Sequence, residues 1–492
     1  MTRFYEYLKK LLDPHYKTAV KIAWLYPDET IQTEFTNELY NINGNLTVNY
    51  QNGARRSCTI TLSSDNNKFP IDYNNIWLGQ KFQLWIGLYL DDGTPFYLPQ
   101  GIFYIKNPKE TYDPNNKTLT LQGVDKWAYL DGSLFGYLRG TYKSLPYQDI
   151  RSLVSGLINK SKYDNNFDVT TDPTLKIDPK NAIFDGFEDK NAEAEIQAYE
   201  HYTGNPVMIT YDLSAGENKY FIFVDGGIRY CNKVAVNNVP TYSAASVIEK
   251  EIPSIYNYAT DKLSIFLNPY TITTEAGKTI ADIVLEYATV LFADVYYDEC
   301  GYLRFVARDR EKQDQSIFNK EMIWHFTVNE KELLGLELTN AFDKVYNDIV
   351  VLGQIIGGKQ MKARIQNRDP ASDTNVDKIG IKTKPPYESD QYYSNQLCLD
   401  LAGYYAQIDM AMDRTGTIKT LPIYHMDVNK LVTLSTPNNN MKREEFLVTG
   451  YSLPLNPVGQ MSLNVTNLKY FINWTNMTYT LEEQGMEEES DE

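Results

Sequence analysis

Cysteine is scarce in this chain. The 492 residues include four, and no two of them lie close enough to form a CxxC motif: Cys58, Cys231, Cys300 and Cys398. At this length and cysteine density we expect reduced, partly buried thiols and no disulfide framework.

Histidine is equally rare, and no HExxH motif occurs. None of the four histidines has another His, Cys or Glu at a spacing typical of metal ligands: His15, His201, His325 and His425. We therefore expect isolated surface or core histidines and no metal site.

Long apolar runs are absent. No stretch approaches the roughly 18 residues that a membrane-spanning helix needs. The first residues, MTRFYEYLKK, are basic but contain no continuous apolar segment, so we expect neither a signal peptide nor membrane insertion.

Positive charge is in deficit, with 47 Lys and Arg against 64 Asp and Glu, a net charge of −17. Such a chain repels polyanions, so we expect no specific binding of nucleic acid. An anionic membrane surface is disfavoured for the same reason.

Motifs for catalysis or cofactor binding are also lacking. No GxSxG nucleophile elbow occurs. Residues 353–360 have the glycine and lysine spacing of a phosphate-binding loop, but Gln360 stands where Mg²⁺ binding needs Ser or Thr. The residues that follow alternate as in a strand, so a hairpin turn is the better interpretation. We assign no catalytic, cofactor-binding or metal-binding residue.

Carboxylates leave one alternative open. A glycosidase pair among Asp294, Asp298 and Glu299 would suit an acidic chain. The simpler interpretation is that Asp298 and Glu299 are turn residues. Sequons for N-glycosylation would matter only in a eukaryotic secretory setting: Asn45, Asn116, Asn159, Asn464, Asn473 and Asn476.

Apolar residues with a period of two are abundant. Residues 58–62 and 82–90 alternate between apolar and polar, and 91–94 is a turn signal that leads into 96–98. Further short strands are predicted at 102–105, 119–121, 345–352, 431–434, 446–449 and 461–465. Together they predict a mainly β protein of the α+β class, with a small barrel or sandwich over roughly residues 18–127 and an α+β insertion after it.

Helical spacing occurs in four places: 150–158, 191–203, 280–291 and 391–412. Thr279 and Asp282 resemble a capping box at the start of the third. A hairpin is expected over 207–224, and another directly after the third helix, turning at residues 298–301.

Length and pattern predict five segments. They are a first β-barrel domain (1–127), an α+β insertion domain (128–258), a small helix-hairpin α+β domain (259–330), a second β domain with an embedded helix (331–470) and an acidic flexible tail (471–492). The first and second β domains are the two that the family resemblance described next implies to be tube-like antiparallel β-barrels.

Several segments, in order along the chain, resemble the hub proteins of phage tail baseplates and tail tips. Residues 342–353 resemble their "YN-hydrophobic-V-x-G" strand, 368–380 their "D-x-P-x-S…I-G" segment, 401–405 their "A-x-Y-L" helix and 450–455 their closing "I-S-x-P-L" hairpin. Residues 45–48, 56–62 and 101–105 are similar to their first β-domain. The resemblance is to hubs of contractile-tailed phages and phage-like particles of the low-GC Gram-positive type.

The resemblance implies a homotrimer in which each subunit supplies two tube-like domains, so that three subunits form a pseudo-sixfold ring. Such a ring joins the tail tube protein to the spike or tip protein and anchors other baseplate subunits. It implies a virion structural protein, assembled in the bacterial host cytoplasm, through whose acidic lumen DNA passes during genome ejection. No enzymatic activity and no cofactor are expected. The alternative is a peripheral baseplate arm, or a tail component that binds a receptor or the cell wall.

Overall fold

The protein is described from a computed structural model of its 492 residues. The structure describes residues 3–13, 15–63, 71, 76–77, 79–113, 116–145, 148–158, 182–185, 190–191, 256–257, 262–263, 266, 268, 271–308, 322–328, 332–340, 345–356, 359–392, 395–410, 414–437, 440, 442–456, 459–467 and 477–480.

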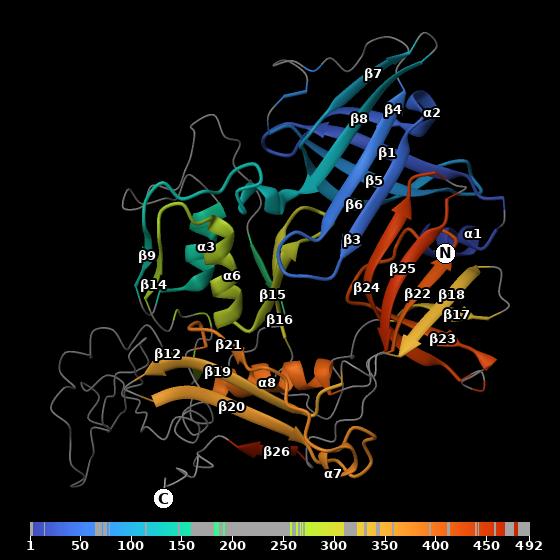
Figure 1. The fold of residues 1–492 in the computed structure, drawn as a ribbon. Helices are drawn as coiled ribbons and strands as arrows, with labels where there is room; N and C mark the ends of the chain where they lie inside the picture. The colour runs from blue at the N-terminus through green and yellow to red at the C-terminus, as the bar shows by residue number, and fades with distance from the viewer. Residues whose placement is uncertain are drawn as a thin grey trace, which may run out of the picture.

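The N-terminal β unit, as we call strands β1 to β8, is antiparallel and begins one end of a large sheet (Figure 1). Its strands alternate buried and exposed side chains, as in β4, so one face packs on a core. Helices α1 (Arg3–Leu11) and α2 (Asn37–Tyr40) flank it. The strands are β1 (Thr18–Leu25), β2 (Ile31–Thr36), β3 (Asn43–Asn49), β4 (Arg56–Ser63), β5 (Lys81–Tyr89), β6 (Pro95–Ile105), β7 (Lys109–Asp113) and β8 (Asn116–Asp125).

The C-terminal β unit supplies the other end of the same sheet. Its strands are β17 (Met322–Thr327), β18 (Leu333–Asn340), β22 (Arg414–Thr420), β23 (Leu431–Ser435), β24 (Glu444–Pro454) and β25 (Met461–Asn467). Their order is β18-β22-β25-β24-β23-β17, and every neighbouring pair except β17 and β23 is antiparallel.

One pairing joins the two β units edge to edge. The second half of β24 lies antiparallel to β3, with Gly450 opposite Asn49 and Pro454 opposite Asn45. The sheet therefore continues from β18 through β24 and β3 into the N-terminal β unit. One hydrophobic core runs beneath this joint, because buried side chains of both units, such as Val48, Ile60, Phe446 and Leu453, belong to it.

The middle unit packs beside the N-terminal β unit, on the left of Figure 1. Its elements are the 3-10 helix η1 (Lys126–Tyr129), β9 (Tyr142–Ser144), α3 (Ile150–Ile158), β10 (Ile183–Asp185), β14 (Ile272–Thr274), α6 (Ile280–Val290), β15 (Ala293–Tyr297) and β16 (Leu303–Ala307). The capping box predicted at Thr279 and Asp282 is confirmed at the start of α6. Helices α3 and α6 share one core, although they come from the segments 128–258 and 259–330.

The hairpin unit lies below the middle unit in Figure 1. It comprises β19 (Asp348–Ile356), β20 (Lys359–Asn367), β21 (Tyr387–Glu388), β26 (Met477–Thr480), α7 (Val376–Ile379) and α8 (Asn395–Asp409). Helix α8 packs on the sheet around Ile349, Ile365 and Leu401. A small sheet of β11 (Lys190–Asn191), β12 (Tyr256–Asn257) and β13 (Lys262–Leu263) completes the described elements.

The predicted fold class, mainly β within an α+β arrangement, is confirmed. The described residues of 353–360 belong to the antiparallel hairpin of β19 and β20, as expected, with Ile356 opposite Lys359. The helix predicted at 191–203, apart from its first residue in β11, and the hairpin at 207–224 lie outside the described residues. Of the segment predicted as an acidic flexible tail, 471–492, the structure describes only residues 477–480, which form β26 against β20. The five segment boundaries stay a prediction. Within the described part of the chain, no helix is both long and apolar enough to cross a membrane.

Candidate functional site: the junction between the units

The loop between β3 and β4, residues 50–55, is where the units meet; we call it the junction loop. Tyr50 N donates to Thr449 O of the C-terminal β unit at 2.8 Å. Gly53 N donates to Val295 O of the middle unit, also at 2.8 Å, and Val295 N donates to Asn52 Oδ1 at 3.0 Å. Gly53 has φ +86°, and a Cβ there would lie 3.0 Å from the Trp127 ring. The loop thus docks two other units by backbone hydrogen bonds.

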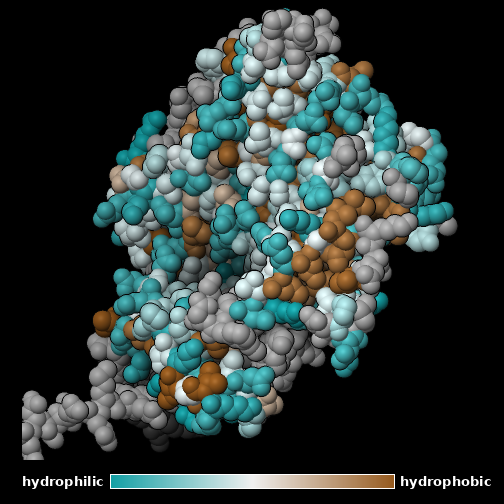
Figure 2. All heavy atoms as spheres, turned by 45° about the vertical axis from the view of Figure 1, so that its right-hand side comes forward, coloured by the Kyte–Doolittle hydropathy of each residue, from teal (hydrophilic) through white to brown (hydrophobic). Residues whose placement is uncertain are grey.

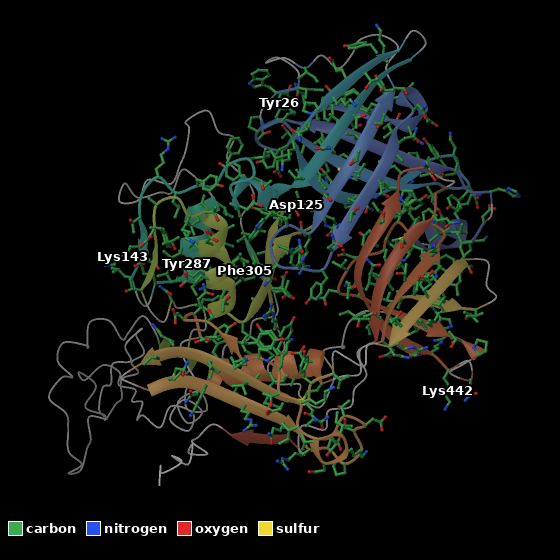
Figure 3. The ribbon with its side chains drawn as sticks, viewed as in Figure 1. Tyr26, Asp125, Lys143, Tyr287, Phe305 and Lys442 are labelled. Carbon is green, nitrogen blue, oxygen red and sulfur yellow. The ribbon has the colours of Figure 1, made fainter. Side chains whose placement is uncertain are left out.

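Asp125, the last residue of β8, holds the end of the junction loop where it enters β4. Its carboxylate accepts hydrogen bonds from the backbone N–H groups of Arg55, Arg56 and Trp127 at 2.8 to 3.0 Å. The last of these makes it the N-cap of η1. Figure 3 places Asp125 between the N-terminal β unit and the middle unit, in which Tyr287 and Phe305 lie. Burial raises the pKa of Asp125 to about 6, because three N–H donors do not fully replace water around the anion.

A buried triad of charges crosses from the N-terminal β unit to the middle unit. Glu29 lies 2.8 Å from the Lys81 ammonium and 2.9 Å from that of Lys126, and all three side chains are at most 3% exposed. Lys126 also donates to Gly301 O of the middle unit at 2.7 Å. Burial alone would raise the pKa of Glu29, but the two ammonium groups overcome it and hold that pKa low.

Arg56 makes two further ion pairs across the units, and Arg308 makes one within the middle unit. The Arg56 side chain is 4% exposed, lies 2.9 Å from Asp427 of the C-terminal β unit and 3.7 Å from Glu299 of the middle unit. Arg308 contacts Asp294 at 3.0 Å, and Tyr50 donates to the same carboxylate at 2.7 Å. The junction is therefore held by charged groups as well as by backbone pairing.

The carboxylates of the glycosidase hypothesis have structural partners. Asp298 accepts hydrogen bonds from the N–H groups of Cys300 and Tyr302 and pairs with Arg304 at 2.7 Å. It is a turn residue, as the simpler interpretation held. Asp294 pairs with Arg308, and Glu299 lies 3.7 Å from Arg56. Each of the three carboxylates therefore belongs to an ion pair with a different arginine.

The histidines and cysteines that the structure describes are dispersed. His425 Nδ1 lies 3.0 Å from the Tyr7 hydroxyl, and His325 contacts Thr433 and Thr327. Cys58 and Cys398 are buried and Cys300 is partly exposed, whereas His201 and Cys231 lie outside the described residues. Among the residues that are described, no three His, Cys, Asp or Glu side chains gather where they could hold a metal ion.

Sequence reasoning missed Glu29, Lys81, Lys126 and Arg56, because isolated charges in strands and turns give no local sign that they will be buried together. For Asp125 a signal existed. An aspartate two residues before Trp127 and directly after a strand is typical of an N-cap. The arrangement as a whole orients and joins domains, and it offers no nucleophile and base in a shared geometry.

No protein-family model and no curated protein matches the sequence. Similar solved structures are a 43 kDa tail protein of prophage MuSo2 from Shewanella oneidensis (9% identity, TM-score 0.48, covering 92% of this chain and 98% of that one) and a tail protein from Neisseria meningitidis MC58 (10%, 0.46, 92% and 97%). A third is prophage tail protein gp18 from Listeria monocytogenes EGD-e (10%, 0.45, 92% and 95%). These three neighbours are tail proteins by their descriptions, but a likeness of this size assigns neither family nor activity.

We expect Glu29→Gln to lower the free energy of unfolding by about 3–5 kcal/mol, because it leaves two buried ammonium groups without their counter-charge. Glu34→Gln is the matched control. Its pair with Lys21 is partly exposed, so it should change stability by no more than about 0.5 kcal/mol. Denaturant unfolding of both variants measures this, and equal losses would contradict the role of the triad.

Asp125 also makes stability depend on pH. Its pKa is raised from an ordinary value of 3.8 to about 6, so the folded state keeps this proton to higher pH than the unfolded chain. Stability from this group is therefore complete below pH ~4 and is lost as pH rises through ~6, up to about 3 kcal/mol. Asp125→Asn lacks this titration. The difference in unfolding free energy, wild type minus variant, should fall between about pH 4 and pH 7.5, and a rise would refute the assignment.

Proposed function

We propose that this chain is a structural, non-enzymatic hub subunit of a phage or phage-like tail baseplate. In this proposal three copies form a pseudo-sixfold ring that joins the tail tube to the central spike or tip and anchors surrounding baseplate proteins. The low-GC Gram-positive type and the place of assembly in the host cytoplasm rest on the sequence segments alone.

One observation carries the proposal. Each chain contains two β units with the same order of strands, joined edge to edge into one sheet. A trimer of such chains would place six similar β units around one axis. Its six β units would match the sixfold symmetry of a tube, and its three chains would match the threefold symmetry of a spike. The net charge of −17 suits a lumen through which DNA passes without binding.

The outer units fit the same role. The middle unit and the hairpin unit have cores of their own and lie beside the large sheet in Figure 1. Because these units have cores of their own, they could bind other proteins outside the ring without disturbing the packing of the ring itself. Charged contacts such as the pair between Glu29 and Lys126 set the orientation of the middle unit.

Light scattering on the purified protein tests the proposal. We expect a mass near three times the 56.6 kDa of the chain, increasing in population with concentration as association requires. Electron micrographs of that species should show a ring with six similar lobes. A strict monomer at every concentration would contradict the hub and favour a peripheral baseplate arm.

A zymogram with bacterial cell wall supplies the control for activity. The wild-type protein should leave the wall intact, because the carboxylates of the junction are bound in ion pairs. Clearing that is lost on Asp294→Asn would contradict a purely structural role.

A further inference from the structure

The two β units correspond strand by strand. Strands of the two units can be matched by their neighbours in the sheet. In chain order, β1 corresponds to β17, β3 to β18, β4 to β22, β5 to β23, β6 with β7 to β24, and β8 to β25. The two units differ in two respects. β17 runs parallel to β23, whereas β1 runs antiparallel to β5, and β2, which pairs with β1, has no counterpart among the described strands.

The registers of the two units also agree. Ile60 lies opposite Leu121, and Ile418 lies opposite Leu463, and all four side chains are buried. Two residues earlier along β4 and β22, Cys58 faces Leu46 and Gly416 faces Leu338. Leu338 of β18 is thus the counterpart of Leu46 of β3.

A shared irregularity fixes the last correspondence. In β24 one extra residue bulges between Val448, opposite Val465, and Gly450, opposite Asn464. The chain from β6 to β7 likewise contains one residue more than the part of β8 that faces it, because Ile105 faces Gly123 and Lys109 faces Thr120. β7 is therefore the counterpart of the second half of β24.

That half of β24 is the part to which β3 is joined. It lies between β25 on one side and β3 on the other, with Ser452 opposite Thr47 and Leu455 N donating to Gly44 O at 3.0 Å. Asn45 Nδ2 also donates to Ser452 Oγ at 2.8 Å. The counterparts of these two strands, β7 and β18, have no such joint within the chain. Among the described strands β7 pairs only with β8, and β18 only with β22.

We infer that β18 of one copy of this chain pairs antiparallel with β7 of the next copy, repeating between subunits the joint of β24 and β3 within the chain. This rests on the proposed ring and names the surface that closes it. The correspondence sets the register: Lys109 opposite Thr339, Thr111 opposite Glu337 and Tyr112 opposite Leu336.

The chemistry of both strands suits this pairing. Each presents a row of backbone N–H and C=O groups at the end of a sheet, the usual template for strand addition. Tyr112 is 58% exposed and Leu334 is 44% exposed, and the pairing would reduce the solvent exposure of both side chains. Lys109 would lie diagonally across from Glu337 on the same face, an attractive placement.

The positions of the strands suit a ring. Figure 1 shows β7 at the top of the molecule and β18 on its right-hand side. β18 is the last strand at one end of the large sheet, and β7 is an edge strand that pairs with β8. Figure 2, which brings the right-hand side forward, shows a continuous hydrophobic area on this side of the molecule. Since the two surfaces differ, the contact is head to tail, and such contacts close into rings when the rotation allows.

A pair of cysteines tests the register directly. Thr111→Cys combined with Glu337→Cys places two thiols on directly opposite residues of neighbouring copies, where Cβ atoms are close enough for a disulfide. Both positions are exposed in the chain, so the monomer fold should tolerate them. We expect mild oxidation to give a covalent trimer on non-reducing gels that returns to monomer on reduction.

The matched control combines Thr111→Cys with Leu338→Cys, one residue out of register and on the other face of the strand. It should cross-link far less, and each single variant should give no covalent trimer above the background of the native thiols. A trimer by light scattering without a cross-link between positions 111 and 337, or with equal cross-linking in the control, would overturn this interface and leave the ring standing. A monomer in light scattering with no cross-link would overturn both.

Discussion

The pairing of β24 with β3 is the contact on which the rest of this structure depends. It brings residues 450–454 against residues 45–49, so that two β units from opposite ends of the chain become one sheet over one core. A strand edge left unpaired would expose backbone groups that water or another chain must satisfy. Satisfying them within the chain makes the two units a single rigid body, and it leaves the corresponding edges at β7 and β18.

Charge burial explains why the middle unit keeps a fixed orientation on that body. Glu29, Lys81 and Lys126 are almost fully buried, and their desolvation is tolerated only in the geometry that pairs them. Asp125 has the same character, because three backbone N–H groups hold it while burial raises its pKa to about 6. Such groups contribute little net stability compared with apolar packing, but they penalise every other orientation of the units. A protein that must present several attachment surfaces around a common axis benefits from this kind of specificity.

The sequence was sufficient to predict those elements whose pattern of apolar residues results from the same one-sided burial that stabilises them. Alternation of apolar residues predicted β4, β5 and β25, and helical spacing predicted α3 and α8, because one-sided burial imposes these periods. The capping box at Thr279 and the hairpin at residues 353–360 were also predictable, since both are made by neighbours in the chain.

By itself, then, the sequence determined the mainly β class, the positions of α3, α6 and α8 and of strands such as β4, β5 and β25, and an acidic chain without a recognisable catalytic motif. Only the tertiary structure decided that β24 would meet β3, that the two β units would share one strand order, and that the charges of the junction would be buried together. The physical reason is that these contacts join residues hundreds of positions apart, such as Arg56 and Asp427. Their partners are selected by shape, register and desolvation over the whole fold, and no local pattern of side chains records that selection.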